Sequence, residues 1–167
     1  VSMFERSGYE VAVLEQNEWD NATHLFEGAG LVVVSVPIRL TEEIIKQLDS
    51  LPPTCILADV TSVKSAPLEA MLATHQGPVV GLHPMFGPNI KSMAKQVVVV
   101  CEGRGKTQYQ WLIEQISIWG AALYHTSAQQ HDDAMAFIQV MRHFSSFVYG
   151  AHLATENPDL DLLVSLS

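Results

Sequence analysis

The fold is decided by the stretch Leu31-Val32-Val33-Val34-Ser35-Val36-Pro37. Its first six residues form an unbroken, largely β-branched run, which is typical of a parallel strand buried on both faces. Pro37 ends this strand because proline cannot donate a ladder hydrogen bond. Comparable apolar runs lie on both sides of it and predict further strands at residues 11–14, 55–60, 79–82, 97–101 and 121–124.

Segments of helical composition separate these strands. Asp20 can cap a helix that runs to Glu27, and Thr41, followed by Glu42 and Glu43, has the pattern of a helix N-terminus. Strands that alternate with helices predict a doubly wound α/β sheet. Residues Ser65–Thr74 are the next predicted helix. Apolar residues also recur at helical spacing at Ile44, Ile45 and Leu48, and at Tyr109, Leu112, Ile113 and Ile116.

The C-terminal part of the chain has a different pattern. Ser127 and Gln130 have capping-box spacing, and helical composition then continues to Asn157 and Pro158. A helix of that length exceeds an ordinary crossover, and a new apolar pattern begins at residues 159–167. We therefore expect a dinucleotide-binding domain over residues 1–126, and over residues 127–167 a long helix with the start of a helical C-terminal domain.

The first residues suggest that the chain begins inside a crossover helix. Met3, Phe4 and Gly8 have the composition of a helix end, whereas a Rossmann unit starts with a strand and a glycine-rich turn. The predicted fold class is therefore α/β, a partial Rossmann-like doubly wound sheet that lacks its first strand and glycine-rich loop and ends in a long interdomain helix.

Composition excludes several classes of protein. Apolar residues make up 48% of the 167 residues and charged residues 16%, which excludes a disordered chain. Nine basic and eighteen acidic side chains give a net charge of -9, so we expect no nucleic-acid partner. We expect no membrane span and no secretory signal. Cys55 and Cys101 lie in apolar runs without C-x-x-C spacing, which indicates reduced thiols and a cytoplasmic protein.

Two strand ends are candidate cofactor contacts. Glu15 directly follows the predicted strand at residues 11–14, where an acidic residue binds the ribose 2′-hydroxyl and favours NAD over NADP in dinucleotide-binding folds. Ser35 and Pro37 close the next strand, and ligands of open α/β sheets lie outside such carboxyl ends. The alternatives are a solvated acid and an ordinary proline that ends a strand.

The segment Asp59-Val60-Thr61-Ser62-Val63-Lys64 places a carboxylate, hydroxyls and a cation at the next strand end. We expect Asp59 to lie near the cofactor. Helix capping is an alternative explanation for Ser62 or Ser65. It does not explain Lys64, because the helix dipole disfavours a cation in a first turn.

The segment Gly81-Leu82-His83-Pro84-Met85-Phe86-Gly87-Pro88 leads a strand directly into a histidine. Pro84 restricts its predecessor, so His83 should be held in an extended conformation at the mouth of the strand. A neutral imidazole there could take a proton from a substrate hydroxyl near pH 7. A hydrogen-bonded turn histidine is the alternative.

The long helix carries His131 and His143. At 100° per residue they lie about 120° apart around its axis, so they need not face one ligand. No spacing matches a zinc motif, and we expect no metal site. A metal hydrolase that uses His131 and Asp132 is the least favoured alternative.

Together these segments resemble the prephenate dehydrogenase family. The resemblance rests on Ser35 to Pro37, Asp59 to Lys64, Gly81 to Pro88, Ala94-Lys95-Gln96-Val97-Val98-Val99, and Met135-Ala136-Phe137-Ile138-Gln139 with Arg142-His143-Phe144. It covers essentially the whole chain. Within the family, the sequence most resembles the dehydrogenase half of bifunctional enzymes in which a chorismate mutase is fused to the dehydrogenase.

The resemblance implies an NAD-dependent enzyme of tyrosine biosynthesis that passes hydride from C4 of prephenate to NAD while the ring carboxylate leaves as CO2. It implies that His83 accepts a hydrogen bond from the C4 hydroxyl and that Ser62 bridges toward His83 and the nicotinamide. It further implies that His131 and His143 belong to the substrate site and that His75 is linked to cofactor binding.

The family's G-x-G-x-x-G loop would precede Val1. Its helical dimerisation domain, with the arginine that clamps a substrate carboxylate, would follow Ser167, so we expect a homodimer only through that domain. Since both parts act by positioning, we predict that the 167-residue chain alone does not turn over prephenate. An arogenate-preferring dehydrogenase and a non-catalytic dinucleotide-binding or regulatory module stay open as alternatives.

Overall fold

A computed structural model describes residues 1–15, 18–19, 22–87 and 89–156. Its centre is a five-stranded sheet with the order β1-β2-β3-β4-β5. The expected α/β architecture is therefore confirmed. The strands are β1 (Leu31–Val34), β2 (Ile56–Asp59), β3 (Val79–Pro84), β4 (Val97–Arg104) and β5 (Ala122–Thr126).

Strand direction changes once across the sheet. β1, β2 and β3 are parallel, β4 is antiparallel to β3, and β5 is parallel to β4. Parallel neighbours need a crossover, usually a helix. Residues 85–96, by contrast, contain only turns and loop among those described, so the chain returns beside β3 in the opposite direction. The carboxyl ends of β1, β2 and β3 consequently meet at one edge.

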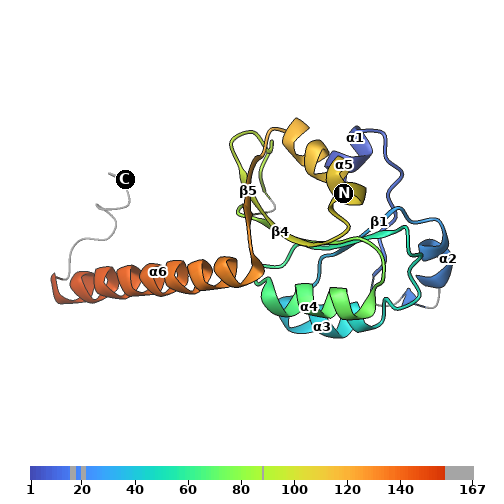
Figure 1. The fold of residues 1–167 in the computed structure, drawn as a ribbon. Helices are drawn as coiled ribbons and strands as arrows, with labels where there is room; N and C mark the ends of the chain where they lie inside the picture. Colours follow the sequence, from blue (N-terminus) through green and yellow to red (C-terminus); the bar gives the residue numbers. More distant parts are fainter. Residues whose placement is uncertain (16–17, 20–21, 88, 157–167) are drawn as a thin grey trace. The chain divides into compact units, whose positions relative to one another are not determined.

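Helices cover both faces of this sheet (Figure 1), and the side chains of each strand alternate between two cores. Leu57 and Val79 face the core shared with α3 and α4, whereas Ala58 and Val80 face the core shared with α5. The helices are α1 (Ser2–Arg6), α2 (Ala22–Glu27), α3 (Ile38–Lys46), α4 (Ser65–Thr74), α5 (Lys106–Ile118) and α6 (Ala128–Glu156).

Several helices lie where the sequence predicts them. α4 has the predicted bounds, α2 ends at Glu27, and the four apolar positions predicted for α5 are its four buried residues. At the start of α6 the capping box is formed reciprocally. The backbone N–H of Gln130 donates to Ser127 Oγ at 3.2 Å, and the backbone N–H of Ser127 donates to Gln130 Oε1 at 3.4 Å.

Three local predictions are wrong. Residues 11–14 form no strand and pair with no other described part of the chain, because an apolar run becomes a strand only beside a ladder partner. β1 is not buried on both faces: Val33 is 39% exposed, since β1 pairs only with β2 among the described strands. The helix predicted to start at Thr41 starts at Ile38, because Pro37 has the fixed φ suited to the N-cap here.

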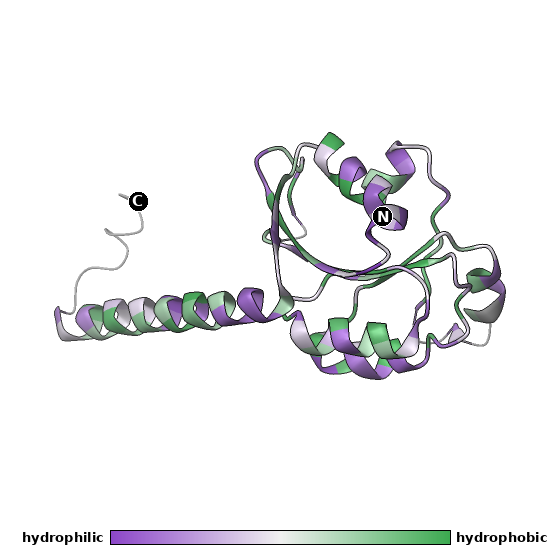
Figure 2. Ribbon diagram, in the orientation of Figure 1, coloured by the Kyte–Doolittle hydropathy of each residue, from purple (hydrophilic) through white to green (hydrophobic). Residues whose placement is uncertain are grey.

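The chain divides into two compact units, Val1–Asp132 and the residues from Asp133 onward. Within the second unit, α6 carries hydrophobic residues along its length (Figure 2), and Phe137, Phe144 and Phe147 are 67%, 62% and 74% exposed. No helix in the described ranges is long and apolar enough to cross a membrane. Asp20 and the pattern predicted at residues 159–167 lie outside the described residues, and the domain boundary at residue 126 stays a prediction.

Candidate active site

A cleft of about 320 Å³ opens where the carboxyl ends of β1, β2 and β3 meet. Ligands of open α/β sheets bind at this edge. Four residues singled out from the sequence, Ser35, Pro37, Ser62 and His83, are brought together there. Val36, Ile38, Val60, Thr61 and Pro84 complete the lining.

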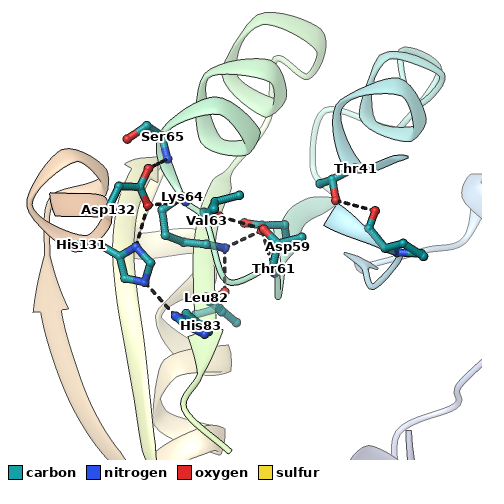
Figure 3. A network of polar contacts seen from close by, with 11 residues as sticks. Thr41, Asp59, Thr61, Val63, Lys64, Ser65, Leu82, His83, His131 and Asp132 are labelled. Atoms are coloured by element: carbon teal, nitrogen blue, oxygen red, sulfur yellow. Dashed lines mark hydrogen bonds and ion pairs between the residues drawn. The ribbon is translucent and has the colours of Figure 1, made fainter. Parts of the chain in front are cut away.

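A chain of hydrogen bonds leads from this cleft into the protein (Figure 3). His83 Nδ1 lies 2.8 Å from His131 Nε2, and His131 Nδ1 lies 2.8 Å from Asp132 Oδ1. The rings meet edge to face, with centroids 5.0 Å apart. His131 is 2% exposed, so it reaches the cleft through His83 and not by lining it.

Asp132 also caps α4 from another part of the chain. Its Oδ1 accepts the backbone N–H of Lys64 and its Oδ2 that of Ser65, both at 2.8 Å. Burial alone would raise the pKa of Asp132, but the hydrogen bonds from Ser65, His131 and the Lys64 backbone outweigh it and hold this pKa at about 2. The carboxylate stays ionised over any ordinary working pH.

A buried ion pair supports the strand ends beneath the cleft. Lys64 Nζ lies 2.5 Å from Asp59 Oδ2 and donates to Leu82 O at 2.7 Å, and both side chains are fully buried. Burial lowers the pKa of Lys64, opposed by the charge of Asp59. Gly81 leaves room for the pair, since a Cβ at this position would lie 3.3 Å from Lys64 Cδ and 3.4 Å from Asp59 Oδ1.

The surroundings of His83 keep its ring neutral. Burial, together with the neighbouring His131 and Lys64, lowers the pKa of His83 from 6.5 to about 4. An imidazole with this pKa is uncharged at neutral pH and can accept a hydrogen bond from a substrate hydroxyl. The sequence predicts that the strand ends at residue 82 and that His83 follows it. In the structure β3 extends to Pro84, and His83 pairs with Val99 inside the sheet.

Two predicted cofactor residues lie away from the cleft. Asp59 is 0% exposed, and its carboxylate binds Lys64 and the backbone N–H of Thr61. In this structure the carboxylate therefore holds the end of the strand, and it does not line the cleft. His75 is 2% exposed and bonds to Cys55 O at 2.7 Å. Cys55 directly precedes β2, so His75 lies at the opposite end of that strand.

Two further candidates are exposed side chains. Glu15 is exposed, and its backbone N–H donates to Glu18 Oε2 at 3.1 Å. His143 is exposed in the second unit. Within the described residues there is no group of three or more histidine, cysteine or acidic side chains that could hold a metal. Cys55 and Cys101 are buried free thiols, and burial raises the pKa of each to about 11.

Sequence reasoning missed the link that Asp132 makes between α6 and α4. A signal was present: α4 has no capping side chain of its own, since Lys64 occupies its N-cap, and a carboxylate directly follows His131. The partner of Asp132 is 68 residues away, however, and local patterns do not identify such a pair.

A mostly parallel sheet with a cleft at its carboxyl edge is typical of nucleotide-binding domains of the dehydrogenase type. The family model described as "Prephenate dehydrogenase, nucleotide-binding domain" matches residues 7–123, and the chain belongs to this family.

Curated relatives extend this similarity. The T-protein of Enterobacter agglomerans is 58% identical over 161 residues, and that of Haemophilus influenzae 51% over 162 residues. Each alignment covers 96% of this chain and 43% of the relative, so the chain spans less than half the length of these proteins. The crystal structure of prephenate dehydrogenase from Aquifex aeolicus has the same fold, with a TM-score of 0.70 at 18% identity over 92% of this chain and 66% of that one.

Proposed function

We propose that this chain is the nucleotide-binding part of an NAD-dependent prephenate dehydrogenase, which oxidatively decarboxylates prephenate to 4-hydroxyphenylpyruvate. The observation that carries the proposal is a neutral histidine, His83, on the cleft at the carboxyl ends of β1, β2 and β3. The family to which the chain belongs supports the same activity.

The cleft suits the reactive end of a dinucleotide. Its volume of about 320 Å³ is at the lower end of small-molecule sites, which range over about 300–1,000 Å³. It therefore fits a nicotinamide ring with its reaction partner better than a whole dinucleotide. Ser35 and Pro37 would hold NAD on the side of β1, and Ser62 would lie between it and His83. Glu15 stays a proposed ribose contact.

The chemistry assigns separate tasks to NAD and to the protein. NAD supplies the hydride acceptor. His83 accepts a hydrogen bond from the C4 hydroxyl of prephenate and polarises it as the C4–H bond breaks and the ring carboxylate leaves as CO2. Because positive charge grows on C4 only as hydride leaves, this interaction strengthens in the transition state and raises the rate more than the affinity.

Three further proposals concern the larger protein. We propose that it is cytoplasmic, that a chorismate mutase is fused to it, and that it forms a homodimer through a helical domain after α6. The exposed apolar residues of the second unit support a further packing surface there. His143 lies in that unit and stays a proposed substrate-site residue.

The test uses the full-length protein that contains this chain. With prephenate and NAD we expect NADH absorbance to rise with one CO2 released for each NADH. A strong preference for arogenate over prephenate would select the arogenate-specific alternative. Stoichiometric NAD binding without NADH formation from either substrate would refute the enzyme and favour a non-catalytic module.

A further inference from the structure

We propose that Asp132 is a positioning residue that acts through His131 to fix which ring nitrogen of His83 carries the proton. The arrangement leaves His83 Nε2 unprotonated on the cleft. This inference rests on the proposed function for its catalytic meaning, but the proton positions themselves can be measured without turnover.

Asp132 fixes the direction of the hydrogen bonds, because an ionised carboxylate only accepts them. Oδ1 and Oδ2 already accept the backbone N–H groups of Lys64 and Ser65, which fixes the carboxylate at the start of α4. The contact of 2.8 Å between Oδ1 and His131 Nδ1 therefore requires the proton to be on Nδ1 of His131.

The protonation of one nitrogen of an imidazole determines the role of the other. A neutral imidazole that carries its proton on Nδ1 has a lone pair on Nε2. His131 Nε2 must then accept from His83 Nδ1, 2.8 Å away. The His83 proton is thus on Nδ1, and its Nε2 is the basic nitrogen available for the hydroxyl of a substrate.

Burial makes this arrangement specific. The His131 side chain is 1% exposed, so bulk water cannot exchange for Asp132 or His83 as its partner. Asp132 has a 25% exposed side chain but is bound by three donors. A comparable carboxylate–histidine pair sets the tautomer of the catalytic histidine in serine proteases, where loss of the carboxylate impairs catalysis strongly.

The decisive variant is Asp132→Ala in the full-length protein, with Asp49→Ala as the matched control because Asp49 is exposed. Without its obligate acceptor, the His131 proton can move to Nε2, which donates to His83 Nδ1 and places the His83 proton on Nε2. We expect kcat for prephenate to fall roughly 10- to 100-fold, as for other partners that orient a functional histidine. We expect the KM for NAD to change less than twofold and Asp49→Ala to match the wild type.

Selective ¹⁵N-histidine NMR reads the proton positions directly. In the wild type we expect a protonated Nδ1 and a bare Nε2 in both His83 and His131. In Asp132→Ala the two ring nitrogens of His83 should become more alike. A wild-type His83 with its proton on Nε2, or a doubly protonated His131, overturns the proposal whatever the activity.

A double-mutant cycle separates this role from the cap on α4. His131→Leu removes the route to His83 but leaves the cap. Adding Asp132→Ala to His131→Leu should therefore lower kcat less than twofold further, while stability still falls. Full additivity in kcat, or an unchanged kcat in Asp132→Ala, contradicts the proposal. The assigned proton positions without any NADH formation would instead refute the proposed function and leave the tautomer assignment standing.

Discussion

Two histidines with little exposure lie at opposite ends of the parallel strands, the buried His75 at the amino end of β2 and the half-buried His83 at the carboxyl end of β3, and their surroundings differ. At the amino end of β2, His75 donates from Nε2 to a single backbone acceptor, Cys55 O. Gly77 closes over this ring, where a Cβ would lie 2.5 Å from Nε2, and Arg104 donates to the carbonyls of His75 and Gly77. His75 and Arg104 bind fixed backbone partners there, and neither lines the cleft at the carboxyl ends of the strands.

At the carboxyl end, His83 is part of a chain of side chains and lines a cleft. Its ring partner, His131, is ionisable, and within the described residues His83 Nδ1 bonds to His131 while His83 also lines the cleft. The comparison teaches that burial alone does not identify a functional histidine. A histidine whose ring bonds to a backbone carbonyl stabilises the fold, as His75 does. A histidine that lies between a cleft and a hydrogen-bonded carboxylate can accept or transfer a proton, as His83 can.

The largest expected effect concerns His83. The variant His83→Asn keeps a hydrogen-bonding group but cannot accept a proton. In the full-length protein, kcat should therefore fall about 10²–10⁴-fold, the range of general-base assistance, with little change in the KM for prephenate or NAD. Steady-state kinetics checks this, with His125→Asn as a control because His125 is half exposed. Near-normal turnover in His83→Asn would make His83 a structural residue like His75.

The next effect concerns the ion pair that supports the carboxyl end. Lys64→Met leaves Asp59 buried without its counter-charge, and the free energy of unfolding should fall by about 3–5 kcal/mol. Lys106→Met is the matched control. Its pair with Glu102 is exposed, with a 58% exposed lysine side chain, and should contribute less than about 1 kcal/mol.

Urea unfolding measures both variants. Adding Asp59→Asn to Lys64→Met should restore part of the lost stability, because it removes the unpaired charge. Equal losses in Lys64→Met and Lys106→Met would show that the buried pair does not hold this end of the sheet.

The elements of the fold differ in how far the sequence predicts them. Local patterns predict α4 with its bounds and the four buried positions of α5, because capping and helical periodicity depend on near neighbours. They fail for residues 11–14 and for the direction of β4. Strand pairing depends on which other segments lie alongside, and no local pattern contains that information.

The cleft is predictable in part for a similar reason. Ser35 and Ser62 follow parallel strands and His83 lies at the end of another, and the carboxyl ends of such strands share one edge. The partners of Lys64 and Asp132 could not be predicted in this way. The sequence does not explain a lysine at the start of α4, because the Lys64 cation lies in the core against Asp59. The carboxylate that accepts the Lys64 backbone N–H belongs to Asp132, 68 positions away.

A smaller effect tests the amino end of β2. His75→Leu leaves Cys55 O without its donor, which should lower the free energy of unfolding by about 1–3 kcal/mol. Turnover and NAD affinity of the folded enzyme should stay within twofold, since His75 is 2% exposed and far along β2 from the cleft. Urea unfolding and NAD titration check this, with His24→Leu as the exposed control. Weaker NAD binding at unchanged stability would restore the cofactor role that the family resemblance implies for His75.

The smallest effect is the pH dependence that His83 gives to folding. Its pKa is lowered from 6.5 to about 4 in the folded protein, so between these values the unfolded chain binds a proton that the folded chain excludes. The contribution of His83 to stability is therefore full above about pH 6.5 and is lost as the pH falls toward 4. The slope is at most about 1.4 kcal/mol per pH unit, the limit for one proton, and less here because the ring is only partly buried. Asp132 does not add to this window, because its pKa is about 2.

Urea unfolding of the wild type and His83→Asn at pH 7 and pH 5 should show the wild type losing more stability on acidification. Parallel losses in the two proteins would mean that His83 titrates in the folded protein as it does in the unfolded chain, and that its surroundings do not keep it neutral.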